Sequence, residues 1–207
     1  MQSTEKKVLH LTEDLLVATG SHRKCYQHPD DSRKCIKVAF GDMGVRTVAR
    51  EIKYLHILMR RGKKAKTMPV FYGPIETDRG RGYIYELVCN ADGSPCLTLG
   101  DFFHDMDLLQ EHFDTIRDLL CFLHADILQG EVVTMTIEVQ NILFPQDAQG
   151  RLSIKMINDI GSPVLIPVFY YSSFFARRKV ERRWKQFRQK MLRSYHEPLI
   201  RELVAQI

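Results

Sequence analysis

Residues 136–144 read TIEVQNILF, and this stretch places one asparagine, Asn141, directly before the short apolar run ILF. Polar side chains on a loop that a buried strand holds in place are frequent ligands in proteins. The segment LSIKMIND (152–159) follows, and PQDAQG (145–150) between the two has the composition of a turn. The pattern predicts a β-hairpin with Asn141 at its beginning and Asp159 at its end.

The part of the chain before this hairpin alternates apolar segments with turns. A helix is expected in VRTVAREIKYLHILMRRGKK (45–64), where Val48, Ile52, Leu55, Leu58 and Met59 recur at helical spacing. Strands are expected in LHLTEDLLVATG (9–20), KCIKVAF (34–40), MPVFYG (68–73) and GYIYELV (82–88).

The second half of the chain is mainly helical. Helices are expected in 98–109 and 114–128, and a basic helix at about 174–195. Strands segregated from helices in this way predict an α+β fold with two lobes, residues 1–89 and 90–207, in a single domain. The boundary is expected in the turn-rich segment 90–94.

The bulk composition indicates a globular intracellular protein. The chain has 207 residues, 44% of them hydrophobic, and a mild formal net charge of +5. Its five cysteines show no paired spacing, which argues against a disulfide framework and a zinc site. Neither a signal peptide nor a bilayer-spanning segment is recognised, so we expect a cytoplasmic location.

Several polar residues follow the order of parts found in a protein kinase. The turn VATGSHRKCY (17–26) precedes Lys37 in an apolar strand, Glu51 lies on the next helix, and Asn141 and Asp159 come far downstream. Taken singly, these residues have simpler interpretations: an edge-strand lysine that reaches solvent, a solvated helix charge, and two caps of turns. Their shared order favours a protein-kinase-like fold.

The chain also resembles the PhoP-regulated YrbL family of bacterial proteins over nearly its full length. This resemblance implies a two-lobed protein-kinase-like fold with a shortened C-terminal lobe, and a place in the PhoP regulatory network in bacterial envelope or magnesium stress. The runs that carry it are TGSHRKCYQHPDDSRKCIKV (19–38), GYIYELV (82–88), VQNIL (139–143), NDIGSPVLIPV (158–168) and RRWKQF (182–187).

The resemblance implies a nucleotide site in the first lobe, with ATP as the expected cofactor. Lys37 matches the strand lysine that contacts nucleotide phosphates, and Glu51 is its expected partner. Gly20 remains from the glycine-rich phosphate loop. Glu86 and Val88 lie where backbone groups of a kinase hinge meet the adenine ring.

The resemblance implies a Mg²⁺ site in the second lobe. Asn141 matches the metal-binding asparagine, and Asp159 in DIG matches the metal-binding aspartate of the DFG motif. Hard oxygen ligands of this kind suit Mg²⁺, which takes its remaining ligands from water and phosphate.

The expected phosphate loop and catalytic loop depart from the kinase pattern. Ala18 and Arg23 replace two glycines, so a plain hairpin with basic surface residues is the alternative to a phosphate loop. Thr136 stands where kinases carry the catalytic aspartate, and a threonine hydroxyl cannot act as a carboxylate base near neutral pH. Glu138 stands where many kinases carry a lysine, which reverses the charge.

Three hypotheses about function follow from this pattern. The favoured one is a nucleotide- and Mg²⁺-binding pseudokinase with weak or absent phosphoryl transfer. In the second, Glu138 replaces the missing base or helps to hold a cation, and the chain is an active atypical kinase acting on a small molecule or a protein. In the third, the chain is a scaffold that acts through its basic helix.

The basic helix offers a surface for anionic partners. Residues Arg177–Arg193 hold one acid, Glu181, among many cations, while Val180, Trp184, Phe187 and Met191 recur at helical spacing. The simplest interpretation is that these apolar residues dock on the second lobe and the cations face water. The alternatives are an acidic protein or an anionic membrane surface; a nucleic acid is not favoured, because no DNA-reading motif is present.

Overall fold

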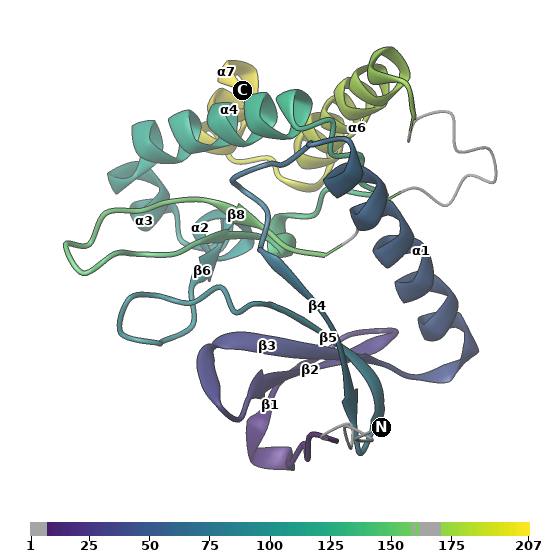
Figure 1. Ribbon diagram of the computed structural model, residues 1–207. Helices are drawn as coiled ribbons and strands as arrows, with labels where there is room; N and C mark the ends of the chain where they lie inside the picture. Colours follow the sequence, from purple (N-terminus) through teal and green to yellow (C-terminus); the bar gives the residue numbers. More distant parts are fainter. Residues whose placement is uncertain (1–7, 159, 162–170) are drawn as a thin grey trace, which may run out of the picture. The chain divides into compact units, whose positions relative to one another are not determined.

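Strands predominate before Asn90 and helices after it, so the predicted α+β class is confirmed. The computed structural model describes residues 8–158, 160–161 and 171–207. In chain order the elements are η1 (Glu13–Leu15), β1 (Leu16–Thr19), β2 (Arg23–His28), β3 (Asp31–Ala39), α1 (Gly41–Arg60), β4 (Phe71–Thr77), β5 (Gly80–Glu86), β6 (Leu97–Thr98), α2 (Leu99–His104), α3 (Met106–Glu111), α4 (Phe113–Gln129), η2 (Val139–Asn141), β7 (Ile142–Phe144), β8 (Lys155–Met156), α6 (Ser173–Ser194) and α7 (Pro198–Gln206) (Figure 1).

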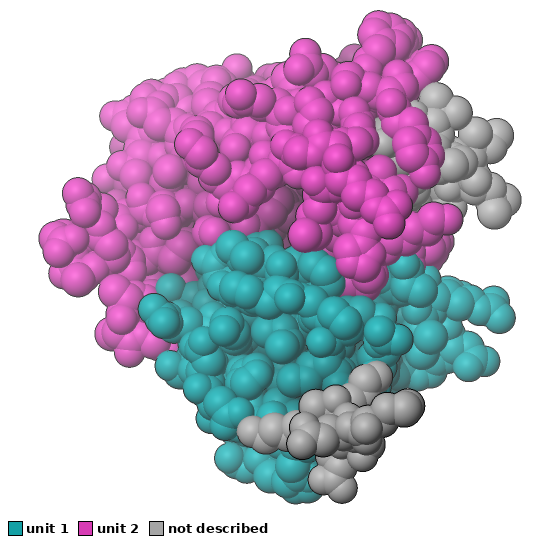
Figure 2. Space-filling view, in the orientation of Figure 1, with its two compact units in different colours: residues 1–49, 69–89 teal, residues 50–68, 90–207 magenta. Residues whose placement is uncertain are grey.

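The chain divides into two compact units, which Figure 2 colours separately. Unit 1 comprises Met1–Ala49 and Pro69–Cys89, and unit 2 comprises Arg50–Met68 and Asn90–Ile207. Helix α1 contributes its first half to unit 1 and its second half to unit 2.

Unit 1 is built on a five-stranded antiparallel sheet of order β1-β2-β3-β5-β4. Its small core gathers Leu11, Tyr26 and Ile36, which are almost fully buried, with Leu9 and Val38 beside them. The predicted strand 9–20 is interrupted by η1, and only its last residues form β1. The predicted turn at 17–26 is also shorter than expected, because β2 begins at its Arg23.

Helix α1 begins four residues before the predicted helix and ends four residues before its predicted end. Gly62 ends it in a left-handed conformation with φ +64, and the Lys63 N–H donates to the Leu58 carbonyl oxygen at 2.9 Å. Met59 was predicted to face the core, but 61% of its surface is exposed, so that prediction is wrong. Tyr54 and Ile57 are buried instead, because the apolar stripe turns around the helix.

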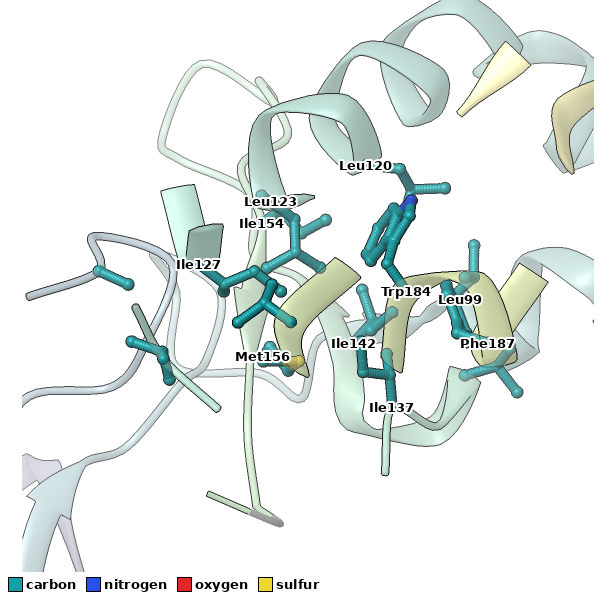
Figure 3. Close-up of a cluster of buried hydrophobic side chains, with 14 of the residues drawn as sticks. Leu99, Leu120, Leu123, Ile127, Ile137, Ile142, Ile154, Met156, Trp184 and Phe187 are labelled. Atoms are coloured by element: carbon teal, nitrogen blue, oxygen red, sulfur yellow. The ribbon is translucent and has the colours of Figure 1, made fainter. Parts of the chain in front are cut away.

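Unit 2 has one large core beneath helices α4 and α6. Figure 3 shows Trp184 and Phe187 of α6 within a cluster that also holds Leu120 and Leu123 of α4 and Ile142 of β7. Val180 and Met191 are also buried, so the prediction that the apolar face of the basic helix docks on this part of the chain is confirmed. One cation departs from the prediction, because Lys179 is only 3% exposed.

The predicted hairpin after Asn141 is confirmed. Strand β7 pairs antiparallel with β8, with Ile142 opposite Met156, and β6 completes a second sheet of three strands. Ile142 of β7 and Met156 of β8 are both buried in the core of unit 2. Within the described part of the chain, no helix has the length and apolarity required to cross a bilayer.

The core of unit 2 can be tested by one truncation with a matched control on the same helix. Leu120→Ala removes a side chain of zero exposure and should lower the free energy of unfolding by about 2–5 kcal/mol. Phe122→Ala removes a larger ring that is 46% exposed and should cost about 0.5 kcal/mol or less. Urea unfolding followed by circular dichroism measures both, and equal losses would contradict this description of the core.

Candidate functional site

A buried carboxylate fixes the beginning of the loop that leads from α4 to Asn141. Glu131 is 1% exposed and has φ +55, a left-handed conformation that is rare for residues other than glycine. Its Oε2 lies 2.5 Å from Nη2 of Arg61 and its Oε1 lies 2.7 Å from Nζ of Lys63. Two cations from the segment directly after α1 therefore hold the turn that follows α4.

The pKa of Glu131 reflects this pairing. Burial raises the pKa of the carboxyl, but hydrogen bonds from Lys63, Ser173 and Arg61 outweigh the effect of burial and leave the pKa below its usual range. The group is therefore ionised in the folded protein near neutral pH. Sequence analysis missed it, because a lone glutamate after a helix gives no periodic signal and its partners lie about seventy residues upstream.

Tyr54 of α1 joins the same loop through its hydroxyl group. The hydroxyl donates to the Glu131 carbonyl oxygen at 2.9 Å and accepts a hydrogen bond from the Val133 N–H at 2.8 Å. Both bonds are buried, so they satisfy backbone groups that water cannot reach. The backbone of residues 131–133 is thereby fixed to the second half of α1.

The loop of residues 133–141 lies beside the segment that flanks Asp159. Thr134 and Ile160 form an antiparallel bridge, and the Gly161 N–H donates to the Val133 carbonyl oxygen at 2.8 Å. Asp159 itself lies outside the described residues. Its neighbours on both sides are nevertheless paired with this loop.

Asn141 lies at the other end of this pairing. Its carbonyl oxygen accepts the Ile157 N–H at 2.8 Å, and its side-chain Oδ1 accepts from Nδ2 of Asn158 at 3.3 Å. Asn158 has φ +64 and, with Glu131, is one of two non-glycine residues with positive φ in the described chain. Such strained positions concentrate at functional sites. The amide oxygen of Asn141 thus faces the residue that precedes Asp159.

Amide and carboxylate oxygens at this place fit the chemistry of a Mg²⁺ site. Within the described residues, no cluster of three or more His, Cys, Asp or Glu side chains could hold a metal ion. The metal-ligand roles of Asn141 and Asp159 stay predictions.

The two candidate catalytic residues belong to the same loop. Thr136 is exposed, while the carboxylate of Glu138 forms an ion pair with Lys190 of α6. Glu138 is 29% exposed and Lys190 58%, so this pair is open to solvent and weak in energy. The Glu138 carboxylate is thus already engaged by a cation of α6.

Lys37 lies on the central strand of the sheet in unit 1. Because β3 is paired on both sides, the interpretation of Lys37 as an edge-strand lysine is wrong. The residue is half-buried, opposite Cys25 on β2 and Tyr83 on β5, and its Nζ lies 5.0 Å from the centre of the Tyr85 ring. A cation over an aromatic face is a favourable arrangement for a partly desolvated ammonium group.

Glu51, the predicted partner of Lys37, is only 4% exposed, so the interpretation as a solvated helix charge is wrong. A buried carboxylate is costly unless it is paired or hydrogen-bonded. Glu51 belongs to unit 2 and Lys37 to unit 1, and the pairing between them stays a prediction.

Gly20 lies in a tight turn between β1 and β2. Its N–H donates to the Arg23 carbonyl oxygen at 2.9 Å, so only residues 20–22 connect the two strands. The His22 carbonyl oxygen accepts the Phe40 N–H at 3.1 Å, and Gly44 packs so tightly on His22 that a Cβ atom would not fit. The expected phosphate loop is thus a hairpin whose tip contacts the start of α1.

Glu86 is the last residue of β5, where it lies opposite Lys34 of β3, and Val88 lies two residues beyond the strand. The Glu86 N–H donates to the Val70 carbonyl oxygen, and one Glu86 carboxylate oxygen accepts the Val70 N–H. Glu86 is thereby bonded to the residue that precedes β4. Val88 lies beyond the strand and makes no hydrogen bond with any described residue. Its backbone groups are therefore available to a ligand, as the hinge hypothesis requires.

Two cysteines were not anticipated as neighbours of Lys37. Cys25 on β2 is half-buried and Cys35 on β3 is buried, and all five cysteines of the chain are free thiols. The hydrogen-bonding interaction with the Cys35 thiol lowers the pKa of Cys25 to about 7; burial opposes this effect, and the charges of Lys37 and Arg23 add to it. Burial and the same bond raise the pKa of Cys35.

The Glu131 cluster predicts a pH-dependent stability. Glu131→Gln keeps the size of the side chain but removes its charge, and should lower the free energy of unfolding by about 1.5–3 kcal/mol at neutral pH. Because the folded-state pKa of Glu131 is lowered, its contribution is present above the unfolded pKa and is lost as pH falls through the folded pKa. Urea unfolding of both proteins should therefore give curves that converge in acid; a difference that grows in acid would contradict this assignment.

The thiol beside Lys37 predicts a measurable titration. The ultraviolet absorbance of thiolate, taken as the native protein minus Cys25→Ser, should rise with a midpoint at pH about 7. Lys37→Met removes a nearby positive charge and should move the midpoint upward. An unchanged midpoint in that variant would contradict the assigned effect of the Lys37 charge on the Cys25 thiol.

Comparison with known proteins gives one family. The model of the family described as PhoP regulatory network protein YrbL matches residues 9–192. The YrbL proteins of Escherichia coli (strain K12) and Shigella flexneri are each 36% identical to this chain over 182 residues, which cover 87% of this chain and 86% of the relative. The matched range includes the Lys37 strand, the Asn141 loop and most of α6. The chain therefore belongs to the family of PhoP regulatory network proteins YrbL.

Proposed function

We propose that this chain is a kinase-like regulatory protein that binds a nucleotide and Mg²⁺ and transfers phosphate weakly or not at all. The observation that carries the proposal is the pairing of the Asn141 loop with the segment around Asp159. The backbone of Asn141 is bonded to Ile157, and Thr134 is bridged to Ile160. Residues on both sides of Asp159 are thus joined to the loop that holds Asn141, which supports a metal site formed by these two side chains.

The arrangement of unit 1 supports the nucleotide part of the proposal. Lys37 lies on the central strand with its ammonium group over the Tyr85 ring, a position from which it would contact phosphate oxygens. Val88 offers backbone groups that make no hydrogen bond within the described residues, as an adenine ring would need. In the proposed complex, Lys37 would neutralise part of the charge of the ATP phosphates.

The catalytic loop supports weak transfer over robust transfer. A threonine hydroxyl at 136 cannot take the proton of an attacking hydroxyl group as a carboxylate does. The nearest carboxylate in the loop, Glu138, is paired with Lys190. Loss of general-base help lowers a rate by about 10²–10⁴ without abolishing transfer that depends on positioning and charge.

The family supports a regulatory role. Its description names the PhoP regulatory network, and we propose that nucleotide occupancy of this chain is the signal that the protein contributes there. Free thiols at all five cysteines agree with a cytoplasmic location, where ATP and Mg²⁺ are available.

Thermal unfolding with ATP and Mg²⁺ tests this proposal. Saturating ligand at about 100 times its dissociation constant should stabilise the native protein by about 2.7 kcal/mol. Lys37→Met and Asn141→Ala should each lose most of that shift. Lys34→Met is the matched control, because Lys34 lies on the same strand, is paired with Asp31 at 3.0 Å, and has no assigned role in nucleotide binding.

The outcomes separate the three hypotheses. Stabilisation by ATP and Mg²⁺ without ATP turnover supports the pseudokinase hypothesis. Stabilisation together with ATP turnover that is lost in Asp159→Asn overturns that hypothesis in favour of an active phosphotransferase. If ATP, ADP and GTP all fail to stabilise the native protein, the proposed nucleotide binding is overturned and the scaffold hypothesis is favoured.

A further inference from the structure

The outward face of α6 lines a groove that is separate from the candidate site. The groove has a volume of about 890 Å³ and is bounded by α6, by His124 of α4 and by Ile207 at the end of the chain. We call it the α6 groove. Its residues on α6 run from Phe175 to Arg188, which is about 20 Å of helix at 1.5 Å per residue.

Positive charge dominates the α6 groove. Five cations line it and one acid, Glu181, accompanies them. The cations on α6 are Arg178, Lys179, Arg182, Lys185 and Arg188.

Three of these cations carry charge that no described residue balances. Arg178, Arg182 and Lys185 are exposed and form no ion pair with any residue in the described ranges. Glu181 lies instead beside His124, with 3.2 Å between its Oε2 and Nε2 of the histidine. Spacings of four and three residues place the three cations on one side of the helix.

The crowding of cations has an electrostatic cost inside the folded chain. Burial lowers the pKa of Lys179, and repulsion from Arg183 and Arg182 lowers it further. Burial and repulsion from Arg182 lower the pKa of Arg183 in the same way. An anion in the groove would relieve this repulsion, because opposite charge stabilises the protonated forms.

The α6 groove also has apolar walls. Trp184 lines it and stacks on His124, with ring centres 4.6 Å apart and an angle of 4° between the planes. Phe175 is 45% exposed at one end, and Ile207 contributes an aliphatic side chain. Trp184 is itself only 3% exposed, so the apolar surface that a ligand could bury is that of Phe175 and Ile207.

These features favour a peptide over the other anionic partners. The apolar face of α6 is buried in the core of unit 2, so it is not available to enter a bilayer as an interfacial helix would. A flat headgroup layer would contact the rim of a concave groove and leave its apolar walls empty. A phosphate backbone would likewise use the charges but not the apolar walls.

We propose that the α6 groove docks a short acidic segment of a partner protein. Carboxylates of the segment pair with Arg178, Arg182 and Lys185, and an apolar side chain packs against Phe175 and Ile207. In an extended conformation about six residues span the groove at 3.3 Å per residue. The proposal does not depend on nucleotide binding, because none of its residues belongs to the candidate site.

Fluorescence polarisation with a synthetic peptide tests the proposal. The probe is a fluorescein-labelled peptide of about six residues in which glutamate alternates with leucine, a length set by the extended rise. Saturable binding to the native protein is expected. The variant Arg182→Glu with Lys185→Glu should weaken binding by about tenfold or more, because reversed charges face the carboxylates.

A matched variant controls for net charge. Lys66→Glu with Arg201→Glu makes the same charge change on exposed residues of unit 2 outside the groove, and should alter affinity by about twofold or less, as expected for screened charges. Unfolding midpoints of both double variants should match that of the native protein. An equal loss of peptide affinity in the two double variants would show that only the net charge of the protein matters. That result would overturn the proposed docking groove.

Changes in the peptide test the same proposal on the native protein. Glutamine in place of glutamate should abolish binding, and alanine in place of leucine should weaken it. Unchanged binding of the glutamine peptide overturns the proposal. So does binding of phosphatidylglycerol vesicles or duplex DNA in the absence of peptide binding, which would assign the groove to a membrane or a nucleic acid.

Discussion

The pairing of the buried Glu131 carboxylate with Arg61 and Lys63 is the interaction on which the candidate metal loop depends. It holds a left-handed turn directly after α4, where the chain changes direction. Gly130 packs against the Lys64 backbone, where a Cβ atom would lie 2.9 Å from the Lys64 carbonyl oxygen. The loop therefore begins from a fixed point, and only then can its backbone pair with Ile160 and Gly161. The ion pairs of Glu131, the close packing of Gly130 and the left-handed turn together determine where the polar site farther along the chain lies.

The candidate site consists of a bonded backbone frame and of the side chains that this frame carries. The frame consists of backbone bonds that join the Asn141 loop to its neighbours, and these bonds do not depend on the identity of residue 136. The side chains of this loop depart from the kinase pattern used as the prediction, because Thr136 stands where that pattern has an acid and Glu138 stands where it has a cation. A protein can lose a general base without losing its loop geometry. Binding and catalysis are therefore separable properties in a chain of this kind.

Local pattern was sufficient to predict the hairpin and the buried face of α6, because an apolar run beside a turn and a helical stripe are both short-range signals. It failed for Met59, since the stripe of α1 rotates as the helix passes from one unit to the other. It also failed for Glu131 and for the pair of Cys25 and Cys35, whose partners become neighbours only in the folded chain. The α6 groove could not be predicted from the sequence for another reason. Cations that line a concave surface and cations on an open helix face have the same spacing in sequence.

The position of Trp184 has a further consequence. It is the one tryptophan of the chain, it is 3% exposed, and it lies in the core of unit 2. Indole emission in this protein therefore reports the melting of unit 2 alone, whereas circular dichroism reports both units. A comparison of the two signals on the unmodified chain can thus show whether the units melt together or in sequence, without any added label.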